Sequence, residues 1–552
     1  MENMETDEEN RAFMHGGIRR RWLSPKRFWK KVFSKKFLVS AGTFVIGILI
    51  GILVIIAFNT IFCKDEHSLD KDTMFKPPHY GPDYEINATH YLEILEELIK
   101  IRTISYGDER DEDNRLAFAE VPKLLNDKFP HIHKSNFTNI TVINGSLCYV
   151  IQGSMPEKKP YMIIAHMDVV PAENEKEWTK HPFGEDDSFE PDPDKMEKDA
   201  DKYLYGRGTL DVKSVIVGTF AGLEVLTHHS WRPERTIYIF IGHDEEIGGY
   251  GGARIAAEML KKENITLEFI LDEGAAATRN HFPGIGDRIV GLIGVVEKGY
   301  LSVDIESSAE AGHSSMPGED SSIGNLAKAI VKISENPFPK HLDEGDLTRE
   351  TLEWIAPYTT WLYRAALSNM WITKPFVLYY LTEPQLQATL KTTTSFTIIK
   401  GGSKENVLPS KSFATINHRL HPRETIQEVL QRDANILRHL ENVEVKERSG
   451  WQNDAPPISP HGPDARAYHA IKSSINNVFE GSIVLPYITV AGTDSKHFVG
   501  LTQNIYRFAP YILDKNHDDT TRIHGINERI NREEFEPFIR FYINLIKTAD
   551  NI

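Results

Sequence analysis

The sequence predicts an α/β protein with a mostly parallel sheet covered by helices, preceded by one transmembrane helix. Short apolar runs at 161–165, 237–241 and 267–271 alternate with helical patterns at 215–226 and 253–260, and such alternation is typical of a parallel sheet with helices on its faces. The second apolar run is β-branched and aromatic without polar alternation, which favours a strand buried on both faces.

Length and charge limit the classes of function. The chain has 552 residues, of which 40% are hydrophobic, so it exceeds one ordinary domain and can bury a large core. Its formal net charge of −16 argues against a nucleic acid as partner. The acidic excess is spread widely and therefore mostly indicates a soluble surface, with a smaller contribution from any cation site.

The amino terminus predicts a membrane anchor. Residues 1–36 form a tail whose segment from Arg19 to Lys36 is rich in Lys and Arg and has no acidic residue, and residues 37–58 follow as an uncharged apolar run. That run is long enough to cross a bilayer and too far from the start for an ordinary cleaved signal peptide. The positive-inside rule keeps the tail in the cytosol. We therefore expect a single-pass type II membrane protein whose remainder is lumenal or extracellular, in a vacuole, lysosome or endomembrane or at the cell surface; later clipping and secretion stays open.

Sequons and cysteines bear on this topology. Every N-x-S/T glycosylation acceptor that we assign lies after the apolar run, as a secretory compartment requires: Asn87, Asn136, Asn139, Asn144 and Asn264. Only two cysteines are present, so no disulfide framework holds the fold. Cys63 could pair between two chains, which leaves a homodimer open. Residues 59–85 are charged and Pro-rich, and we expect them to form a stalk.

Polar side chains follow the predicted strands in four places: His166 and Asp168 in A-H-M-D-V-V-P, Asp211 after L-Y-G-R-G-T-L, Glu245 and Glu246 after I-F-I-G, and Asp272 and Glu273 after E-F-I-L. Because the carboxyl ends of parallel strands meet at one edge, these side chains should lie together. Each alone has a simpler explanation, such as Asp211 as a helix N-cap or Asp272 as a turn former. Four in succession favour a metal centre, and imidazole and carboxylate ligands suit zinc, cobalt or manganese in a hydrolytic site.

Eight motifs in order resemble one known family. They are A-H-M-D-V-V-P, Y-G-R-G-T-L-D-V-K, G-H-D-E-E, L-D-E-G, A-G-H-S-S-M-P, N-H-R-L-H-P, G-T-D-S-K-H-F and R-I-H-G-I-N-E, within residues 86–550. Together they resemble the dinuclear zinc family of aminoacylases, carboxypeptidase S and bacterial glutamate carboxypeptidases. The likeness is greatest to the branch of carboxypeptidase S and the N-fatty-acyl-amino acid synthase/hydrolases.

The resemblance implies two zinc ions per chain, with cobalt or manganese as alternatives. One would be held by His166, Asp211 and Asp272, and the other by Asp211, Glu246 and His524, with Asp211 bridging. Many relatives have a second Asp after the bridging one, where this chain has Val212. That difference leaves the bridging ligand, Asp211, unchanged.

The resemblance also assigns catalytic and substrate-binding roles. Glu245 would be the general base and then the proton donor, and Asp168 would orient His166 through its second ring nitrogen. His313 would donate to the carbonyl oxygen in the transition state. Four further residues would contact the substrate: Arg419, Asn406, Gly492 and Thr493.

The resemblance implies a zinc exopeptidase-like catalytic domain interrupted by a lid. Residues 86–297 and 446–552 would form the catalytic domain, and residues 298–445 an inserted α+β lid. Between Trp354 and Tyr380 the lid is far richer in aromatics than the chain's 10%. Packing within the lid explains such density, and the alternative is an apolar trough or membrane-facing surface for a long acyl chain.

We predict a zinc-dependent amidohydrolase that cleaves, and in reverse forms, the amide bond of N-acyl amino acids. The alternative is a vacuolar or lysosomal type of metallocarboxypeptidase that releases C-terminal residues from short peptides. A non-enzymatic binding protein is the third class, and it is disfavoured because no predicted ligand or base is missing. The predicted partners are thus a small N-acyl amino acid or short peptide and a membrane.

Overall fold

The computed structural model describes residues 35–63, 84–107, 115–184 and 188–552, and the chain divides into two compact units, 1–62 and 63–552. In the first unit α2 (Lys35–Ile61) contains a 20-residue segment, Gly42–Ile61, that is long and apolar enough to cross a membrane. This helix is either a signal sequence or an anchor. The basic tail before Lys35 and most of the predicted stalk lie outside the described residues.

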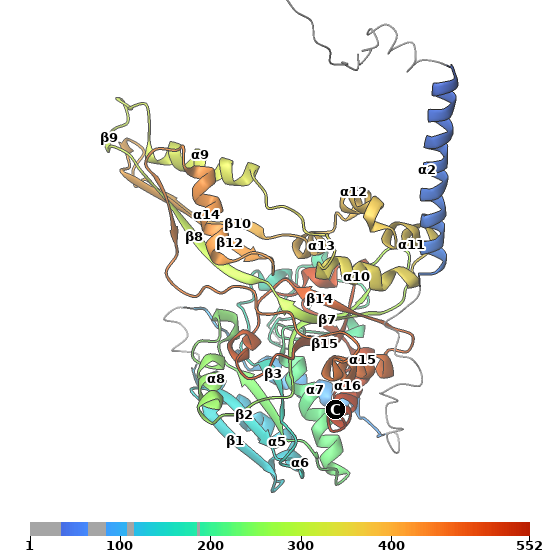
Figure 1. Cartoon of the computed structure of the whole chain (residues 1–552). Helices are drawn as coiled ribbons and strands as arrows, with labels where there is room; N and C mark the ends of the chain where they lie inside the picture. The colour runs from blue at the N-terminus through green and yellow to red at the C-terminus, as the bar shows by residue number, and fades with distance from the viewer. Residues whose placement is uncertain (1–34, 64–83, 108–114, 185–187) are drawn as a thin grey trace, which may run out of the picture. The chain divides into compact units, whose positions relative to one another are not determined.

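The second unit is built on an eight-stranded sheet in the order β1-β2-β5-β3-β6-β15-β7-β14 (Figure 1). Its strands are β1 (Thr138–Ile143), β2 (Ser146–Ile151), β5 (Ile237–Gly242), β3 (Tyr161–His166), β6 (Ile270–Arg279), β15 (Ile505–Asp514), β7 (Val290–Glu297) and β14 (Ile483–Thr489). The pairs β3–β5, β3–β6, β6–β15 and β7–β14 are parallel, whereas β1–β2, β2–β5 and β15–β7 are antiparallel. The predicted fold class, a mostly parallel sheet with helices, is confirmed.

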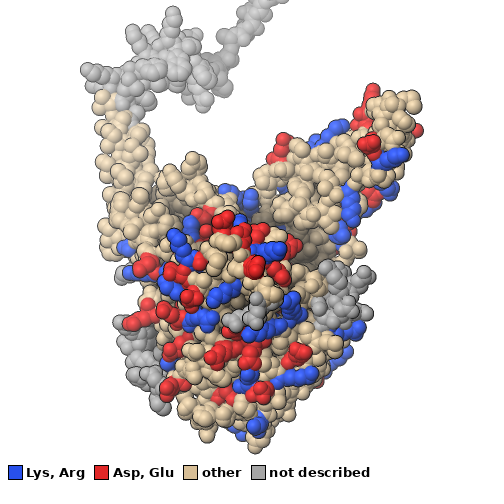
Figure 2. Space-filling view, turned by 180° about the vertical axis from the view of Figure 1, so that it is seen from behind, with Lys and Arg blue, Asp and Glu red and all other residues tan. Residues whose placement is uncertain are grey.

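Helices cover both faces of this sheet. Strand β3 shows this directly, because Ile163 packs into the larger hydrophobic cluster while Met162 and Ile164 pack into a second one, as the alternation of side chains along a strand requires. The larger cluster is formed with α3 (Ala88–Lys100), α7 (Lys213–His228), α15 (Arg466–Val478) and α16 (Phe535–Ala549), and the second with α8 (Ala253–Lys262). On the face shown in Figure 2 acidic and basic side chains are interspersed.

A second sheet, the lid sheet, follows β7 directly. It is antiparallel in the order β10-β12-β8-β13 and consists of β8 (Gly299–Ser308), β10 (Thr393–Gly401), β12 (Lys411–Leu420) and β13 (Val443–Glu447). Helices α9 (Ser322–Glu335) and α14 (Ile426–Leu437) pack on it through a separate apolar cluster (Figure 1). The division of residues 63–552 into catalytic and lid domains stays a prediction.

The aromatic-rich segment forms five short helices beside the lid sheet: α10 (Leu347–Ile355), η6 (Ala356–Tyr358), α11 (Trp361–Leu367), α12 (Met370–Tyr380) and α13 (Pro384–Thr389). Trp354 is buried, but it packs into the larger hydrophobic cluster of the eight-stranded sheet and not within the lid. Most aromatic side chains of α11 and α12, in contrast, are exposed. Packing therefore explains only part of the aromatic density.

Candidate active site

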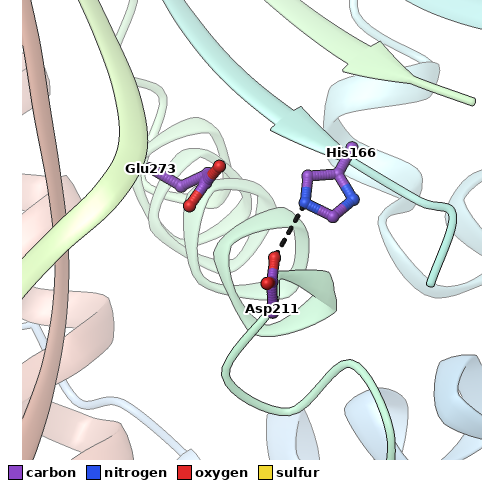
Figure 3. Close-up of side chains that lie close together, drawn as sticks. All are labelled: His166, Asp211 and Glu273. Atoms are coloured by element: carbon purple, nitrogen blue, oxygen red, sulfur yellow. Dashed lines mark hydrogen bonds and ion pairs between the residues drawn. The ribbon is translucent and has the colours of Figure 1, made fainter. Parts of the chain in front are cut away.

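Two groups of acidic and imidazole side chains meet at the carboxyl edge of the eight-stranded sheet, which we call the catalytic sheet. His166, Asp211 and Glu273 form one group and Asp211, Glu246 and His524 the other, with the ligand atoms of each group within 4.8 Å of one another. Nε2 of His166 lies 2.9 Å from Oδ1 of Asp211, and Nε2 of His524 lies 3.0 Å from its Oδ2. Figure 3 shows the first group, in which the three side chains converge from different elements. Asp211 belongs to both groups and can bridge two ions.

Each member is positioned by the end or interruption of an element. His166 closes β3, and the Glu245–Glu246 pair lies in η5 (Glu245–Ile247), directly after β5. Asp211 lies just before α7, and the Asp211–Val212 peptide bond is cis. His524 lies in the loop before β16 (Arg529–Asn531) with a φ of +60°.

The first group contains Glu273 where we predicted Asp272. The predicted strand ended before both residues, but β6 continues to Arg279, with a register shift against β15 around Gly274, whose φ is +104°. Adjacent side chains of a strand point in opposite directions, so only one of the two carboxylates can face Asp211. The carboxylate of Asp272 is buried elsewhere and accepts the backbone N–H groups of Glu273 at 2.9 Å and Ser495 at 2.8 Å.

Asp168 connects His166 to the turn that carries Glu245 and Glu246. Its carboxylate accepts the backbone N–H groups of both glutamates, each at 3.1 Å, and the hydroxyl of Ser105 at 2.8 Å. Nδ1 of His166 donates to the Asp168 carbonyl at 2.9 Å and lies 3.4 Å from its carboxylate. The second ring nitrogen, Nε2, is thereby directed toward Asp211.

A buried ion pair, to which the sequence analysis gave no role, joins the two halves of the site. Nη1 of Arg207 donates to Oε2 of Glu528 at 2.6 Å, and both side chains are buried. Oε1 of Glu528 accepts the backbone N–H of Asp211 at 3.1 Å, while Nη2 of Arg207 donates to the carbonyl of His524 at 3.2 Å. Both residues lie in motifs of the resemblance, Y-G-R-G-T-L-D and R-I-H-G-I-N-E, and that is the only sequence signal for them.

The donor set fits a pair of divalent cations. Oε1 of Glu246 is buried and has no hydrogen-bond partner among the described residues, and burial together with the charge of Asp211 raises the pKa of Glu246 to about 6. Burial and the charges of Asp211 and Asp272 raise the pKa of Glu273 well above its usual range. Carboxylates that are buried together in this way are stabilised by bound cations, and imidazole with carboxylate is the ligand set of a hydrolytic zinc, cobalt or manganese site.

A cavity of about 780 Å³ is bordered by members of both groups. Glu245 also borders this cavity but belongs to neither group. Burial, with the charges of Asp494 and Glu246, raises the pKa of Glu245 well above its usual range, against the opposing charge of His166. A carboxylate held beside two ligand groups, and not part of either, can exchange a proton with a water between them.

Arg419 and Gly492 border the same cavity as these acids. The guanidinium carbon of Arg419 lies 4.7 Å from the ring centre of Tyr300, and no carboxylate among the described residues lies within ion-pair distance of it. Arg419 is half-buried, and a guanidinium without an ion-pair partner that borders a cavity suits a carboxylate ligand. Thr493 does not border the cavity; its N–H and hydroxyl both donate to Glu297, each at 3.0 Å.

His313 and Asn406 lie together, but away from this cavity. His313 is in the exposed strand β9 (Gly312–His313), which pairs with β11 (Val407–Leu408), and the N–H of Ser314 donates to the Asn406 carbonyl at 3.1 Å. Neither residue borders the cavity. Figure 1 shows β9 at the end of the lid sheet that points away from the catalytic sheet.

All five predicted glycosylation acceptors, from Asn87 to Asn264, are exposed. The side chain of Asn87 accepts the N–H of His90 at the start of α3, and that of Asn144 donates to the Gly251 carbonyl. Exposure is the structural condition for modification at these positions.

Comparison with known proteins places these features in one family. The description "Peptidase family M20/M25/M40" matches residues 162–548. The chain is 38% identical over 461 residues to the N-fatty-acyl-amino acid synthase/hydrolase PM20D1 of Xenopus tropicalis, which covers 83% of this chain and 86% of that protein. It is 32% identical over 509 residues to the probable carboxypeptidase S-like 2 of Dictyostelium discoideum, with 91% and 93% covered.

A solved structure shows the same fold at low identity. The M20 family metallo-carboxypeptidase Sso-CP2 from Sulfolobus solfataricus aligns with a TM-score of 0.58 and 16% identity, over 84% of this chain and 99% of that one. This likeness concerns the fold alone.

Proposed function

The chain belongs to peptidase family M20/M25/M40 and is a metallohydrolase of that family, and on this basis we propose that it hydrolyses the amide bond of N-acyl amino acids. The observation that carries the proposal is one cavity that is bordered both by the two ligand groups sharing Asp211 and by an Arg419 without an ion-pair partner among the described residues. Such a cavity can hold an amide whose amino acid part carries a free carboxylate.

In the proposed site His166, Asp211 and Glu273 hold one zinc ion, and Asp211, Glu246 and His524 hold the other, with cobalt or manganese as alternatives. The chemistry that two such ions supply is a more acidic water and a polarised carbonyl. Asp168 and the Arg207–Glu528 pair hold the ligands in place.

Glu245 takes the proton from the attacking water and returns it to the leaving amine. Its place in η5 is fixed by the hydrogen bond from its own backbone N–H to Asp168, so its carboxylate is held beside the ligand groups. Arg419 pairs with the substrate's carboxylate, and the backbone at Gly492 borders the same end of the cavity.

The charges that border the cavity favour an acylated over a free amino group. The acids among its lining residues are Asp211, Glu245, Glu246 and Glu273, all of which have a role in the proposed metal and base chemistry. The other charged lining residues, apart from His524, are cations: Arg419, Arg448 and Lys496. No lining carboxylate is therefore left for the ammonium group of a dipeptide, whereas a neutral acyl group needs none.

Relatives described as carboxypeptidase S-like keep short peptides as the second candidate. The test is the specificity constant kcat/KM for N-oleoyl-phenylalanine, its methyl ester and glycyl-leucine. We expect the acyl amino acid to be preferred and its methyl ester to be poor, because the ester leaves Arg419 unpaired. Preference for glycyl-leucine would replace the proposed substrate class, and full turnover of the ester would remove Arg419 from the site.

We further propose that α2 is an anchor with residues 1–34 in the cytosol and residues 63–552 in a lumenal or extracellular compartment. The five exposed sequons support this orientation. Glycosidase treatment of the cellular protein should reduce its apparent mass, and an epitope before Arg19 should be accessible only from the cytosol. An unglycosylated protein would contradict the orientation.

A further inference from the structure

Helices α11 and α12 expose a dense set of aromatic side chains, which we call the aromatic face. The exposed fractions are 69% for Trp361, 51% for Trp371, 55% for Phe376, 75% for Tyr379 and 63% for Tyr380. In the described part of residues 63–552, every exposed tryptophan and tyrosine lies in these two helices. An apolar patch of this kind is unusual on a soluble surface and indicates an interaction site.

The aromatic face belongs to helices that are packed on their other side. Met370 and Val377 of α12 are buried in a cluster with Leu342, Leu352 and Leu390. Helix α11 is held at its start, where the N–H of Thr360 donates to the Gly284 carbonyl at 2.7 Å. The aromatic side chains are therefore exposed by an ordered scaffold.

The segment that carries the aromatic face contains basic but no acidic residues. Between Trp354 and Thr382 the chain has no acidic residue, and its charged side chains are Arg364 and Lys374. Arg364 donates to the carbonyls of Pro357 and Thr359, and Lys374 forms an ion pair with Asp343. This contrasts with the net charge of −16 for the whole chain.

We propose that the aromatic face docks into the headgroup region of a lipid bilayer, the same bilayer that α2 spans. Trp and Tyr with Lys and Arg are the side chains that anchor proteins at the membrane interface. Residues 62–83 connect α2 to the described start of the second unit, and 22 residues reach at most roughly 75 Å. A tether of this length keeps the second unit at a high effective concentration near that bilayer. This reach rests on the proposed anchor.

The face is distinct from the catalytic cavity. None of Trp361, Trp371, Phe376, Tyr379 and Tyr380 borders that cavity, whereas Gln385 in the next helix, α13, does. The predicted acyl trough along this segment is therefore not part of the cavity. A docked face would instead bring the cavity close to acyl amino acids that partition into the bilayer.

The first test uses the full chain reconstituted into vesicles of phosphatidylcholine and phosphatidylserine with brominated acyl chains, which quench nearby tryptophan. Replacing Trp361 and Trp371 by Phe keeps the apolar surface and removes two reporters. We expect the quenched amplitude to fall clearly in the variant, because the two tryptophans that the proposal places in the headgroup region are gone. Equal quenching of both proteins would overturn the proposal. Acrylamide would then quench Trp361 and Trp371 if the face is exposed to solvent, and would not quench them if a second copy of the chain covers it.

The second test removes the surface. In the same vesicles the triple variant W361S/W371S/F376S should turn over N-oleoyl-phenylalanine about tenfold more slowly, with unchanged turnover of N-acetyl-phenylalanine. The matched control is Ile399→Ser, an exposed apolar residue on β10, which should change neither rate. Equal loss with both substrates would indicate a folding defect and count against docking. Extraction of the full chain by alkaline carbonate would show separately that the anchor has failed.

Discussion

Glu245 and Glu246 are adjacent residues to which the structure gives different surroundings. Glu246 shares its group with Asp211 and His524, while Glu245 belongs to neither group. We expect Glu245→Gln to retain both metal ions and to lose turnover by about 10²–10⁴-fold or more, because a general base contributes on that order. Metal content by atomic emission, measured beside kcat, checks this, and Glu246→Gln is the matched variant, in which metal content should fall. Loss of metal from the Glu245 variant alone would exchange the two roles.

Asp272 and Glu273 provide a second comparison of neighbours. Glu273 faces Asp211, whereas Asp272 is occupied by the N–H groups of Glu273 and Ser495. Glu273→Gln should therefore reduce the bound metal from two ions toward one. Asp272→Asn should keep both ions but lower the free energy of unfolding by about 1–3 kcal/mol, because it weakens two buried hydrogen bonds to a charged group. The opposite pattern would restore Asp272 as the ligand.

Most members of the two ligand groups could be predicted from the sequence, but the choice between Asp272 and Glu273 could not. His166, Asp211, Glu246 and His524 could be proposed as ligands because each follows from a strand end or a motif, and the structure brings them together. The third member of the first group depends on a register shift in β6, which places Glu273 and not Asp272 beside Asp211. A pattern of apolar residues gives the presence of a strand but not where its pairing becomes irregular.

At the scale of elements, the site depends on contacts between segments far apart in the chain. Arg207 and Glu528 are separated by 321 residues, and together they connect the loop before α7 with the loop that carries His524. Sequence spacing contains no information on such a pair. The order of the parallel strands, in contrast, follows local rules, which is why the fold class could be predicted.

Removing one partner of this pair should disturb the second metal position. Arg207→Met should lower the free energy of unfolding by about 3–5 kcal/mol, because it leaves the charge of Glu528 buried without its partner. Metal content should fall as well, since Arg207 holds the carbonyl of His524. Arg540→Met is the control: it breaks an exposed pair with Glu536 within α16 and should change stability by less than about 1 kcal/mol. Equal effects of the two variants in urea unfolding would contradict a special role for the buried pair.

In the whole molecule, His313 lies at the tip of the lid sheet and away from the cavity of its own chain (Figure 1). The sequence could place His313 in the second domain, but not at its tip, because the length and direction of the lid strands are set by pairing across the sheet. Nδ1 of His313 lies 2.7 Å from the hydroxyl of Ser315, which leaves Nε2 to act as a donor. Since His313 does not border the cavity of its own chain, we propose that a catalytic His313 acts in the cavity of a second copy.

Two inactive variants test this arrangement. If His313 acts across a twofold dimer, each cavity needs Glu245 from one copy and His313 from the other, because contacts across a twofold axis are reciprocal. We expect H313A and E245Q to be nearly inactive alone and to regain about a quarter of wild-type activity when co-expressed, since half of the dimers are mixed and each mixed dimer has one intact cavity. The double variant H313A/E245Q, co-expressed with wild type, is the control: its mixed dimers have no cavity with both residues intact, so only the wild-type dimers contribute and activity should fall to about a quarter of wild type, whereas a His313 acting within its own chain would leave about half. Co-expressed single variants that stay inactive although mixed dimers are recovered would show that His313 has no role in the cavity of a second copy.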